Sequence, residues 1–417
     1  MVWGLIGVLG LFGLPVYVLM GGIALWAFHV AGIEISAVAV EMYRLASAPT
    51  LLSIPLFTFA GYVMAESKSP ERLLRLADVL FGNLRGGTAI MGIVLCAFFT
   101  AFTGASGVTI IALGGLLMPI LIKEGYSERF ALGLITTCGS LGLLFPPSLP
   151  IILYGIIAKA DIDKLFRAGI LPGIVLMLVL AGWSILQAPP KREKVPFTWE
   201  RLRAALWLNR WELPLAPLVL GGIYGGFTTT TEAATLAALY VLFAQCVLYR
   251  DLSFTRDIPR VASESLTLVG AILVILCAAM GMTNYLVDQE VPMKILAAMQ
   301  GLISNKWIFL LVLNLFLLVV GCLMDIFSAI IVVVPLILPV AQQFGVDPFH
   351  LAIVFLTNLE IGYITPPVGI NLFISSFRFN RPVLELYKAS FPFLLLLLGA
   401  LIVITYIPWL TLFLLSS

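Results

Sequence analysis

The sequence predicts an all-α membrane protein that crosses the bilayer many times. Of its 417 residues, 61% are hydrophobic and only 11% are charged, and the mean hydropathy is +1.09. A soluble protein of this composition would expose a largely apolar exterior, so the sequence predicts membrane lipid as its solvent. A β-barrel is not expected, because runs such as 330–334 and 394–399 lack the alternation of barrel strands.

Several apolar runs are close to or above the length of about 20 residues that a helix needs to cross the hydrocarbon core. They cover residues 168–187, 223–248, 266–287, 307–323 and 389–415. The N-terminal run from Val2 to about Val30 has no basic segment before it and is too long for a signal-peptide core. We therefore expect it to be a retained first span.

The sequence carries no signature of an enzyme. It contains no nucleotide-binding loop, no GxSxG or HExxH motif, and only two histidines, His29 and His350, which lie far apart. We therefore expect neither a cofactor nor direct use of ATP. The five cysteines lie in apolar stretches without a CxxC pair, so we expect small buried residues rather than disulfides, with a helper role near the substrate path as the alternative.

A polar stretch at residues 189–210 divides the chain near its middle, and the two halves match at a fixed offset of 220 positions. The matched pairs are Gly61 with Gly281, Pro119 with Pro339, Gly125 with Gly345, Gly142 with Gly362, and Pro146-Pro147 with Pro366-Pro367. Several glycine and proline matches in one register predict an internal repeat, which is common in transporters.

The distribution of lysine and arginine predicts that the repeats are inverted. With the N-terminus placed inside, 18 of the 24 basic residues fall in loops on one side, which the positive-inside rule assigns to the cytoplasm. The opposite side holds only Arg44, Lys159, Lys164, Arg167, Lys294 and Lys306. Residues 88–122 then enter and leave at the cytoplasmic face and residues 307–343 at the outer face, so each segment is predicted to form a re-entrant hairpin.

The predicted organisation is therefore two inverted repeats around a linker. The first, 1–188, contains scaffold spans, an inward-entering hairpin at about 88–122 and a broken helix at about 130–158. Residues 189–210 form a cytoplasmic linker. The second, 211–417, contains scaffold spans, an outward-entering hairpin at about 307–343 and a broken helix at about 349–378.

Each predicted hairpin turns in a polar patch at membrane depth. The first patch contains Thr103, Ser106 and Thr109, and the second contains Asp325 and Ser328. Irregular backbone is tolerated there only where protein or a water-filled cavity satisfies its polar groups. Carbonyl and hydroxyl oxygens suit a small alkali cation, and N–H groups at a helix start suit a carboxylate. A seam of small residues for helix packing is the alternative.

The helix after each hairpin is interrupted by a pair of prolines. Two prolines in succession remove backbone hydrogen bonds and must break the helix, which frees carbonyl groups for a cation; a simple kink is the alternative. We expect the tips and the breaks to line the substrate path, through Thr103, Thr109, Pro146, Pro147, Ser148, Ser328, Pro366, Pro367 and Asn371.

Three acidic residues lie within apolar sequence, where a charge is costly and is usually kept for function. They are Glu232, Asp325 and Glu360. Glu232 follows a threonine run, so a charge at the start of a helix is the alternative there. Asp325 is at a hairpin tip, where a helix cap is the alternative, and for Glu360 the alternative is a position at the membrane–water boundary.

Four segments resemble the large membrane subunit of tripartite ATP-independent periplasmic (TRAP) transporters, the DctM-like permeases. They are GVTIIALGGLLMPILIKEGY (107–126), GSLGLLFPPSLPIILYG (139–155), GGIYGGFTTTTEAA (221–234) and NLEIGYITPPVGINLF (358–373). The resemblance runs through nearly all of the chain. One departure is that Thr230 stands where the family often has proline, in Thr-Pro-Thr-Glu, which leaves the local backbone bend open.

The resemblance implies an elevator-type transporter of the ion transporter superfamily that uses sodium as its coupling ion. Mapped onto this sequence, one sodium site would involve Ser106, Gly139 and Ser140, and the other Asp325, Asn358, Gly362 and Thr365. It also implies a small four-helix membrane subunit, a periplasmic substrate-binding protein and a carboxylate substrate in a bacterial inner membrane, with no nucleic-acid partner. The small subunit is not expected to be fused here, because no four spans precede Val2.

Two other functions remain as alternatives. A stand-alone ion-coupled carboxylate symporter could share the architecture without needing a binding protein. A lipid-modifying enzyme would need a cluster of acids or histidines at one interface, which the sequence does not contain.

Overall fold

The computed structural model describes residues 16–32, 34, 36–46, 49–190, 198–290, 293–294 and 305–415. It confirms the all-α prediction, because the described residues form helices and turns without a strand. Seven described helices are long and apolar enough to cross a membrane, and one bent pair would make an eighth. The predicted first span is described only from Val16 onwards, and residues 191–197 of the predicted linker lie outside the described residues.

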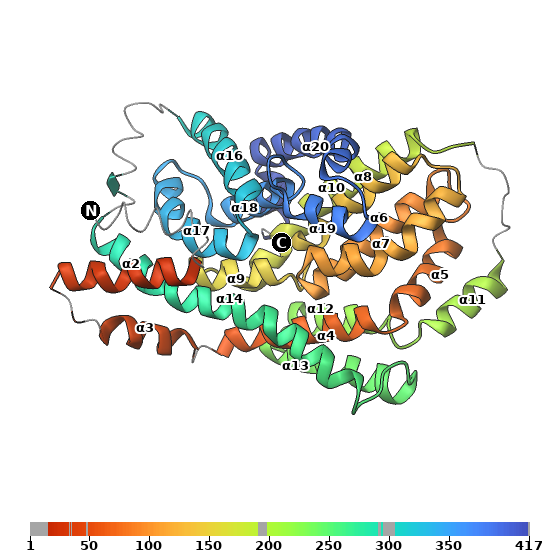
Figure 1. Ribbon diagram of the computed structural model, residues 1–417, viewed down its shortest axis with the longest axis horizontal. Coiled ribbons are helices and arrows are strands. Elements are labelled where there is room, and N and C mark those ends of the chain that lie inside the picture. Colours follow the sequence, from red (N-terminus) through yellow and green to blue (C-terminus); the bar gives the residue numbers. More distant parts are fainter. Residues whose placement is uncertain are drawn as a thin grey trace.

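The helices form two layers (Figure 1). The lower layer in that view contains α2 (Val16–Val30), α3 (Ser36–Ala46), α4 (Ser53–Glu66), α12 (Leu215–Tyr224), α13 (Thr230–Phe243) and α14 (Asp257–Asp288). In this layer α14 packs along α2, α3 and α4, and α4 packs on α13. We refer to it as the lower layer.

The upper layer contains the predicted hairpins and broken helices of both halves. From the first half come α6 (Gly87–Thr103), α7 (Ser106–Lys123), α8 (Glu128–Cys138), the 3-10 turn η2 (Leu141–Leu144), α9 (Leu149–Ala158) and α10 (Ile162–Leu186). From the second half come α16 (Lys306–Leu323), α17 (Ile326–Gln343), α18 (Pro348–Gly362), α19 (Ile370–Phe379), α20 (Val383–Tyr406) and α21 (Trp409–Leu412).

The bounds of these elements repeat with the offset seen in the sequence. Adding 220 to the bounds of α7 gives those of α17, and the same shift brings α6 to within one residue of α16. The proline pairs 146–147 and 366–367 are both joined by cis peptide bonds. The helix segments before and after the first pair are bent by 43°.

Short polar side chains fix where several of these helices begin. The Asp161 carboxylate accepts hydrogen bonds from the backbone N–H groups of Asp163 and Lys164, and Asp347 caps α18 in the same way. Such caps satisfy N–H groups that have no partner within the helix. They therefore fix the residue at which each helix begins after its loop.

The structure refines three sequence-based expectations. The apolar run 223–248 contains one helix long and apolar enough to cross a membrane, residues 230–248, which starts after the run begins because the chain turns at Gly226, with a φ of +69°, and Thr229 caps the helix. The run 389–415 is interrupted after Tyr406, because Pro408 has no N–H to continue the helix. The predicted linker contains a helix, α11 (Trp199–Leu208).

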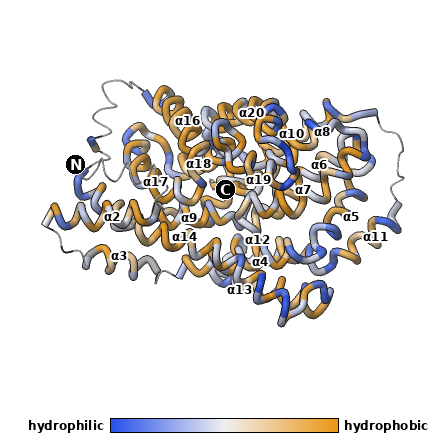
Figure 2. Tube along the Cα trace, in the orientation of Figure 1, coloured by the Kyte–Doolittle hydropathy of each residue, from blue (hydrophilic) through white to orange (hydrophobic). Residues whose placement is uncertain are grey.

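Hydropathy follows this arrangement. Apolar residues run along the helices of both layers, whereas hydrophilic ones gather at helix ends and in loops (Figure 2). All five cysteines are free, and Cys96, Cys138 and Cys322 are buried, which agrees with the expectation of small core residues.

A buried polar network fixes α5 (Ser69–Phe81) to the segment around α11. Arg72 binds Glu212 at 2.5 Å and Asp251 at 2.6 Å, and its guanidinium also donates to Gln245 at 2.8 Å. The Asn209 amide donates to the backbone oxygen of Arg72 at 2.9 Å. Each buried charge thus has a partner of opposite sign, so α5 and the start of the second half are held together.

Candidate functional site

The two halves interlock through their interrupted helices. The half-helix α9 from the first half packs against α17 of the second hairpin, and α19 from the second half packs against α7 of the first hairpin. A Cβ on Gly107 of α7 would lie 2.9 Å from Cδ1 of Ile374 on α19. Each hairpin is therefore supported by the half-helix of the other half.

The first hairpin turns at Gly104, whose φ of +63° is a left-handed conformation that favours glycine. A Cβ there would also lie 2.2 Å from Cδ1 of Leu149 on α9. At this turn the Thr103 hydroxyl lies 3.4 Å from the carbonyl oxygen of Ala105. The tip is thus pressed directly against the helix break.

Thr100 connects this hairpin to the break. Its hydroxyl oxygen lies 2.8 Å from the Thr109 hydroxyl on the other arm and 2.8 Å from the carbonyl oxygen of Gly139. Sequence reasoning missed Thr100, although its position one turn before the polar tip was a usable signal. The hydroxyl holds both arms of the hairpin at the point where α8 ends.

The first set of predicted site residues is brought together around this hydroxyl. The carbonyl oxygen of Ser106 would lie 3.4 Å from a Cβ on Gly139. The Asn371 amide, from the other half, donates to the Ser140 hydroxyl at 3.3 Å and to the Thr136 carbonyl at 3.2 Å. Ser106, Thr109, Gly139, Ser140 and Asn371 therefore form one cluster of oxygen-bearing groups.

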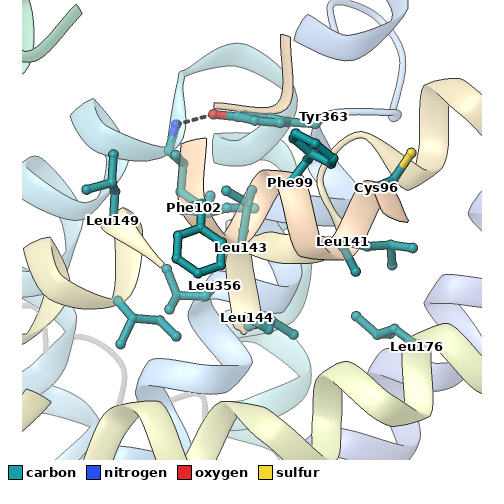
Figure 3. Close-up of a cluster of buried hydrophobic side chains, with 14 of the residues drawn as sticks. Cys96, Phe99, Phe102, Leu141, Leu143, Leu144, Leu149, Leu176, Leu356 and Tyr363 are labelled. Atoms are coloured by element: carbon teal, nitrogen blue, oxygen red, sulfur yellow. Dashed lines mark hydrogen bonds between the residues drawn. The ribbon is translucent and has the colours of Figure 1, made fainter. Parts of the chain in front are cut away.

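The break in the first half is sealed from solvent. Pro146, Pro147 and Ser148 are all buried, and the Ser148 hydroxyl donates to the carbonyl of Leu143. Figure 3 shows leucines of η2 packed against Phe99 and Phe102 of the hairpin and Leu356 of α18. In this conformation an apolar cluster covers the first break.

Asp325 forms the tip of the second hairpin and caps α17. Its Oδ1 accepts hydrogen bonds from the backbone N–H groups of Phe327 and Ser328, each at 3.0 Å. Its Oδ2 accepts from the Ser328 hydroxyl. The capping alternative therefore accounts for Oδ1 of Asp325. Among the described residues, Oδ2 forms a hydrogen bond with the Ser328 hydroxyl alone.

The second hairpin is joined to its break by backbone groups. The N–H of Ile326 donates to the Tyr363 hydroxyl at 2.8 Å, the bond drawn in Figure 3. The N–H of Gly369 donates to the carbonyl of Cys322 at 3.1 Å. Close packing is needed here, because a Cβ on Gly362 would lie 2.4 Å from the carbonyl carbon of Gly321.

The other predicted residues of the second set are not bonded to Asp325. The Thr365 hydroxyl donates to the carbonyl of Ile361 at 2.8 Å. The Asn358 amide donates to Oδ1 of Asn314 at 2.7 Å and to the carbonyl of Val354 at 2.8 Å. Sequence reasoning missed Asn314. Its amide donates a hydrogen bond to the Thr405 hydroxyl at 3.1 Å.

The second break is more open than the first. Pro366 and Pro367 are exposed and Thr365 is half-buried. The Tyr387 hydroxyl donates to the carbonyl of Pro367. The two proline pairs thus occupy opposite environments in one conformation.

Several buried oxygens near the breaks have no hydrogen-bond partner among the described residues. They are Oγ1 of Thr137, Oδ1 of Asn358, Oδ1 of Asn371 and both carboxyl oxygens of Glu360. Buried polar atoms are usually paired, so a group of unpaired acceptors is unusual. Glu360 is only 1% exposed, which removes the alternative that it faces the membrane boundary.

Glu232 has a local role. Its carboxylate accepts from the backbone N–H of Thr229 at 2.8 Å, while the Thr229 hydroxyl accepts from the N–H of Glu232 at 3.3 Å. This reciprocal pair is a capping box at the start of α13. The helix-start alternative is therefore confirmed for this acid.

Residues 3–410 match the model of the family described as the DctM component of the tripartite ATP-independent periplasmic transporter. The chain is 36% identical over 408 residues to an isethionate TRAP transporter permease protein, DctMQ, of Oleidesulfovibrio alaskensis, covering 96% of this chain and 64% of that protein's length. It is 35% identical to the C4-dicarboxylate TRAP transporter large permease protein DctM of Pseudomonas aeruginosa, covering 90% of this chain and 88% of that protein.

The fold also resembles the solved structure of the Alcanivorax borkumensis YdaH transporter. The TM-score is 0.61 at 15% identity, over 89% of this chain and 87% of that one. At this identity the likeness concerns the fold alone.

The contact between Gly362 and Gly321 predicts a stability effect. Gly362→Ala should lower the thermal stability of the purified protein, because the new methyl group meets backbone atoms that cannot rotate away; overpacking of this kind costs about 1–3 kcal/mol. Gly399→Ala on α20 is the matched control, since nothing lies within 4 Å of its Cβ position. Equal melting temperatures for the two variants would contradict the close packing of α16 on α18.

Proposed function

Because the chain belongs to the DctM family of tripartite ATP-independent periplasmic transporters, we propose that it is a sodium-driven permease subunit for an organic acid. One observation carries the proposal: oxygen atoms gather at the first hairpin and its break, and in the second half an acidic tip accompanies unpaired buried oxygens on the helix that leads to the break. In the first half the oxygens belong to Ser106, Thr109, Gly139 and Ser140. In the second half Oδ2 of Asp325 lies at the tip, and the unpaired oxygens of Asn358 and Glu360 lie on α18 ahead of its break.

Hard oxygen ligands of this kind suit a small cation rather than a transition metal. A buried carboxylate without a partner costs several kcal/mol, and a bound cation offsets that cost. We therefore place sodium at both hairpin and break pairs, with Ser106, Gly139 and Ser140 at the first and Asp325, Asn358, Gly362 and Thr365 at the second. The organic acid would lie between the tips, near the helix starts of α7 and α17, where N–H groups favour a carboxylate.

We propose that the two halves are inverted repeats and that the upper layer moves as one unit. The repeated element bounds support the repeat. The exchange of half-helices supports a common movement, because each hairpin packs on a half-helix of the other half. The lower layer would be the fixed scaffold of this elevator.

Two partners belong to the proposal. A small membrane subunit would complete the scaffold, and a periplasmic binding protein would deliver the acid to the permease in the inner membrane. The relatives are named for isethionate, a sulfonate, and for C4-dicarboxylates. The proposed substrate class is therefore an organic anion of either kind. A stand-alone symporter of the same fold would instead take up free acid without a binding protein.

Sodium dependence is the direct test of the function. Proteoliposomes containing this chain, its small partner and a loaded binding protein should take up the labelled acid only with an inward sodium gradient. Equal uptake in potassium with a proton gradient alone would refute sodium coupling, and full uptake without binding protein would favour the stand-alone symporter.

Asp325 separates capping from cation binding. Asp325→Asn keeps the oxygen that accepts the two backbone N–H bonds but removes the negative charge, and asparagine caps nearly as well. We expect a several-fold higher sodium concentration for half-maximal uptake with an unchanged melting temperature.

Asp347→Asn is the matched control for that measurement. Asp347 caps α18 through the same pair of backbone bonds, to Phe349 and His350, but lies at the far end of that helix from the break. Its sodium titration should match that of the parent chain. An unchanged titration in Asp325→Asn as well would limit Asp325 to the helix cap.

A further inference from the structure

A cavity of about 570 Å³ lies at the base of the first hairpin, beside α11. Its walls come from α5, α6, α7 and α11, with apolar side chains that include Met91, Ile120 and Leu208. Its volume falls in the range of about 300–1,000 Å³ that is common for small-molecule sites. It shares no residue with the two sets of oxygen ligands described above.

The helix α11 has the character of a membrane-interface helix. Trp199 is 77% exposed and Trp207 is 68% exposed, and the Arg210 guanidinium lies 4.6 Å from the ring centre of Trp207. Exposed tryptophan beside arginine is typical of the headgroup layer of a bilayer. The cavity therefore opens at headgroup level, on the side that the basic residues assign to the cytoplasm.

The rim of the cavity carries both signs of charge. Arg75 and Lys123 are exposed at the rim and form no ion pair among the described residues. Asp78, Glu124 and a third cation, Arg201, also line the cavity. A simple anion would meet the carboxylates as well as the cations, whereas a group with a phosphate and an ammonium complements both.

We propose that this cavity binds one zwitterionic phospholipid of the inner leaflet. Its phosphate meets Arg75 and Lys123, its ammonium group meets the carboxylates of Asp78 and Glu124, and an acyl chain lies on Met91 and Ile120. An apolar floor beneath a charged rim fits an amphiphile better than it fits a soluble acid.

The site lies at the boundary of the proposed moving unit. Its α5 wall is held to the second half by the Arg72 network, whereas its α6 and α7 wall is the first hairpin. If the hairpin slides, the cavity must change shape, so lipid occupancy would favour one position. That consequence rests on the proposed function, whereas binding of the lipid does not.

The test measures lipid retained by the full-length protein. Protein purified in mild detergent is incubated with phosphatidylethanolamine, and native mass spectrometry counts the bound molecules. Arg75→Gln combined with Lys123→Gln should lower the fraction of protein holding a lipid about tenfold. Arg203→Gln on α11 is the matched control, because Arg203 is exposed and does not line the cavity.

Two further measurements keep the outcome decisive. Ala204→Phe should also displace the lipid, because Ala204 lines the cavity and the larger side chain occupies part of it without a change in charge; it serves if the double variant does not fold. Inorganic phosphate at millimolar concentration should not compete. Equal retention in the cavity variants and the control would overturn the lipid site, and displacement by phosphate would make it a site for a soluble anion.

Discussion

The structure depends on satisfying backbone groups that two helix breaks leave open inside an apolar bundle. Lipid offers no hydrogen bonds, so each break must find partners within the protein or in a water-filled path. Hydroxyls and amides supply many of them. The Thr100 hydroxyl donates to the carbonyl of Gly139, and the Asn371 amide donates to the carbonyl of Thr136. The Tyr363 hydroxyl accepts from the N–H of Ile326. The remaining unpaired oxygens include those that we assign to cations.

These partners come largely from the opposite half of the chain or from the neighbouring hairpin. Asn371 lies in the second half but bonds to the first break. The two breaks therefore form one interlocked unit, which explains how a discontinuous backbone stays ordered. In the proposed mechanism this interlocking would make the two hairpins move together.

The sequence predicted much of this arrangement because its strongest signals are local. The paired prolines indicated where each helix is interrupted, and the 220-residue offset of the sequence recurs in the bounds of α7 and α17. Thr100 lies one turn before the polar tip, which was a usable signal for its role, but nothing in the local sequence indicates the bonding partner of Thr100 or of Asn314. Only the fold brings Gly139 to Thr100 and Asn358 to Asn314.

The difference in burial between the breaks could not be read from the sequence either, since both halves carry the same proline pair. Tertiary packing decides it: an apolar cluster covers Pro146 and Pro147, whereas Pro366 and Pro367 are exposed. The start of the span within the run 223–248 could not be read from the sequence for a related reason, because composition alone does not reveal a turn that depends on a left-handed glycine and a threonine cap. One conformation thus opens one break and seals the other.

In the proposed mechanism the upper layer moves as one unit against the lower layer, so the exposed second break changes its surroundings while the first break stays covered by residues of its own layer (Figure 3). Thiol labelling tests this most directly, with Ser148→Cys and Thr365→Cys placed separately in a chain whose five native cysteines are replaced. We expect an impermeant reagent to reach Thr365→Cys at a rate that sodium with substrate changes, whereas Ser148→Cys, covered by residues of the same layer, stays unreactive during uptake. Labelling of Ser148→Cys during uptake, or a Thr365→Cys rate that sodium and substrate leave unchanged, would contradict movement of the upper layer as one unit.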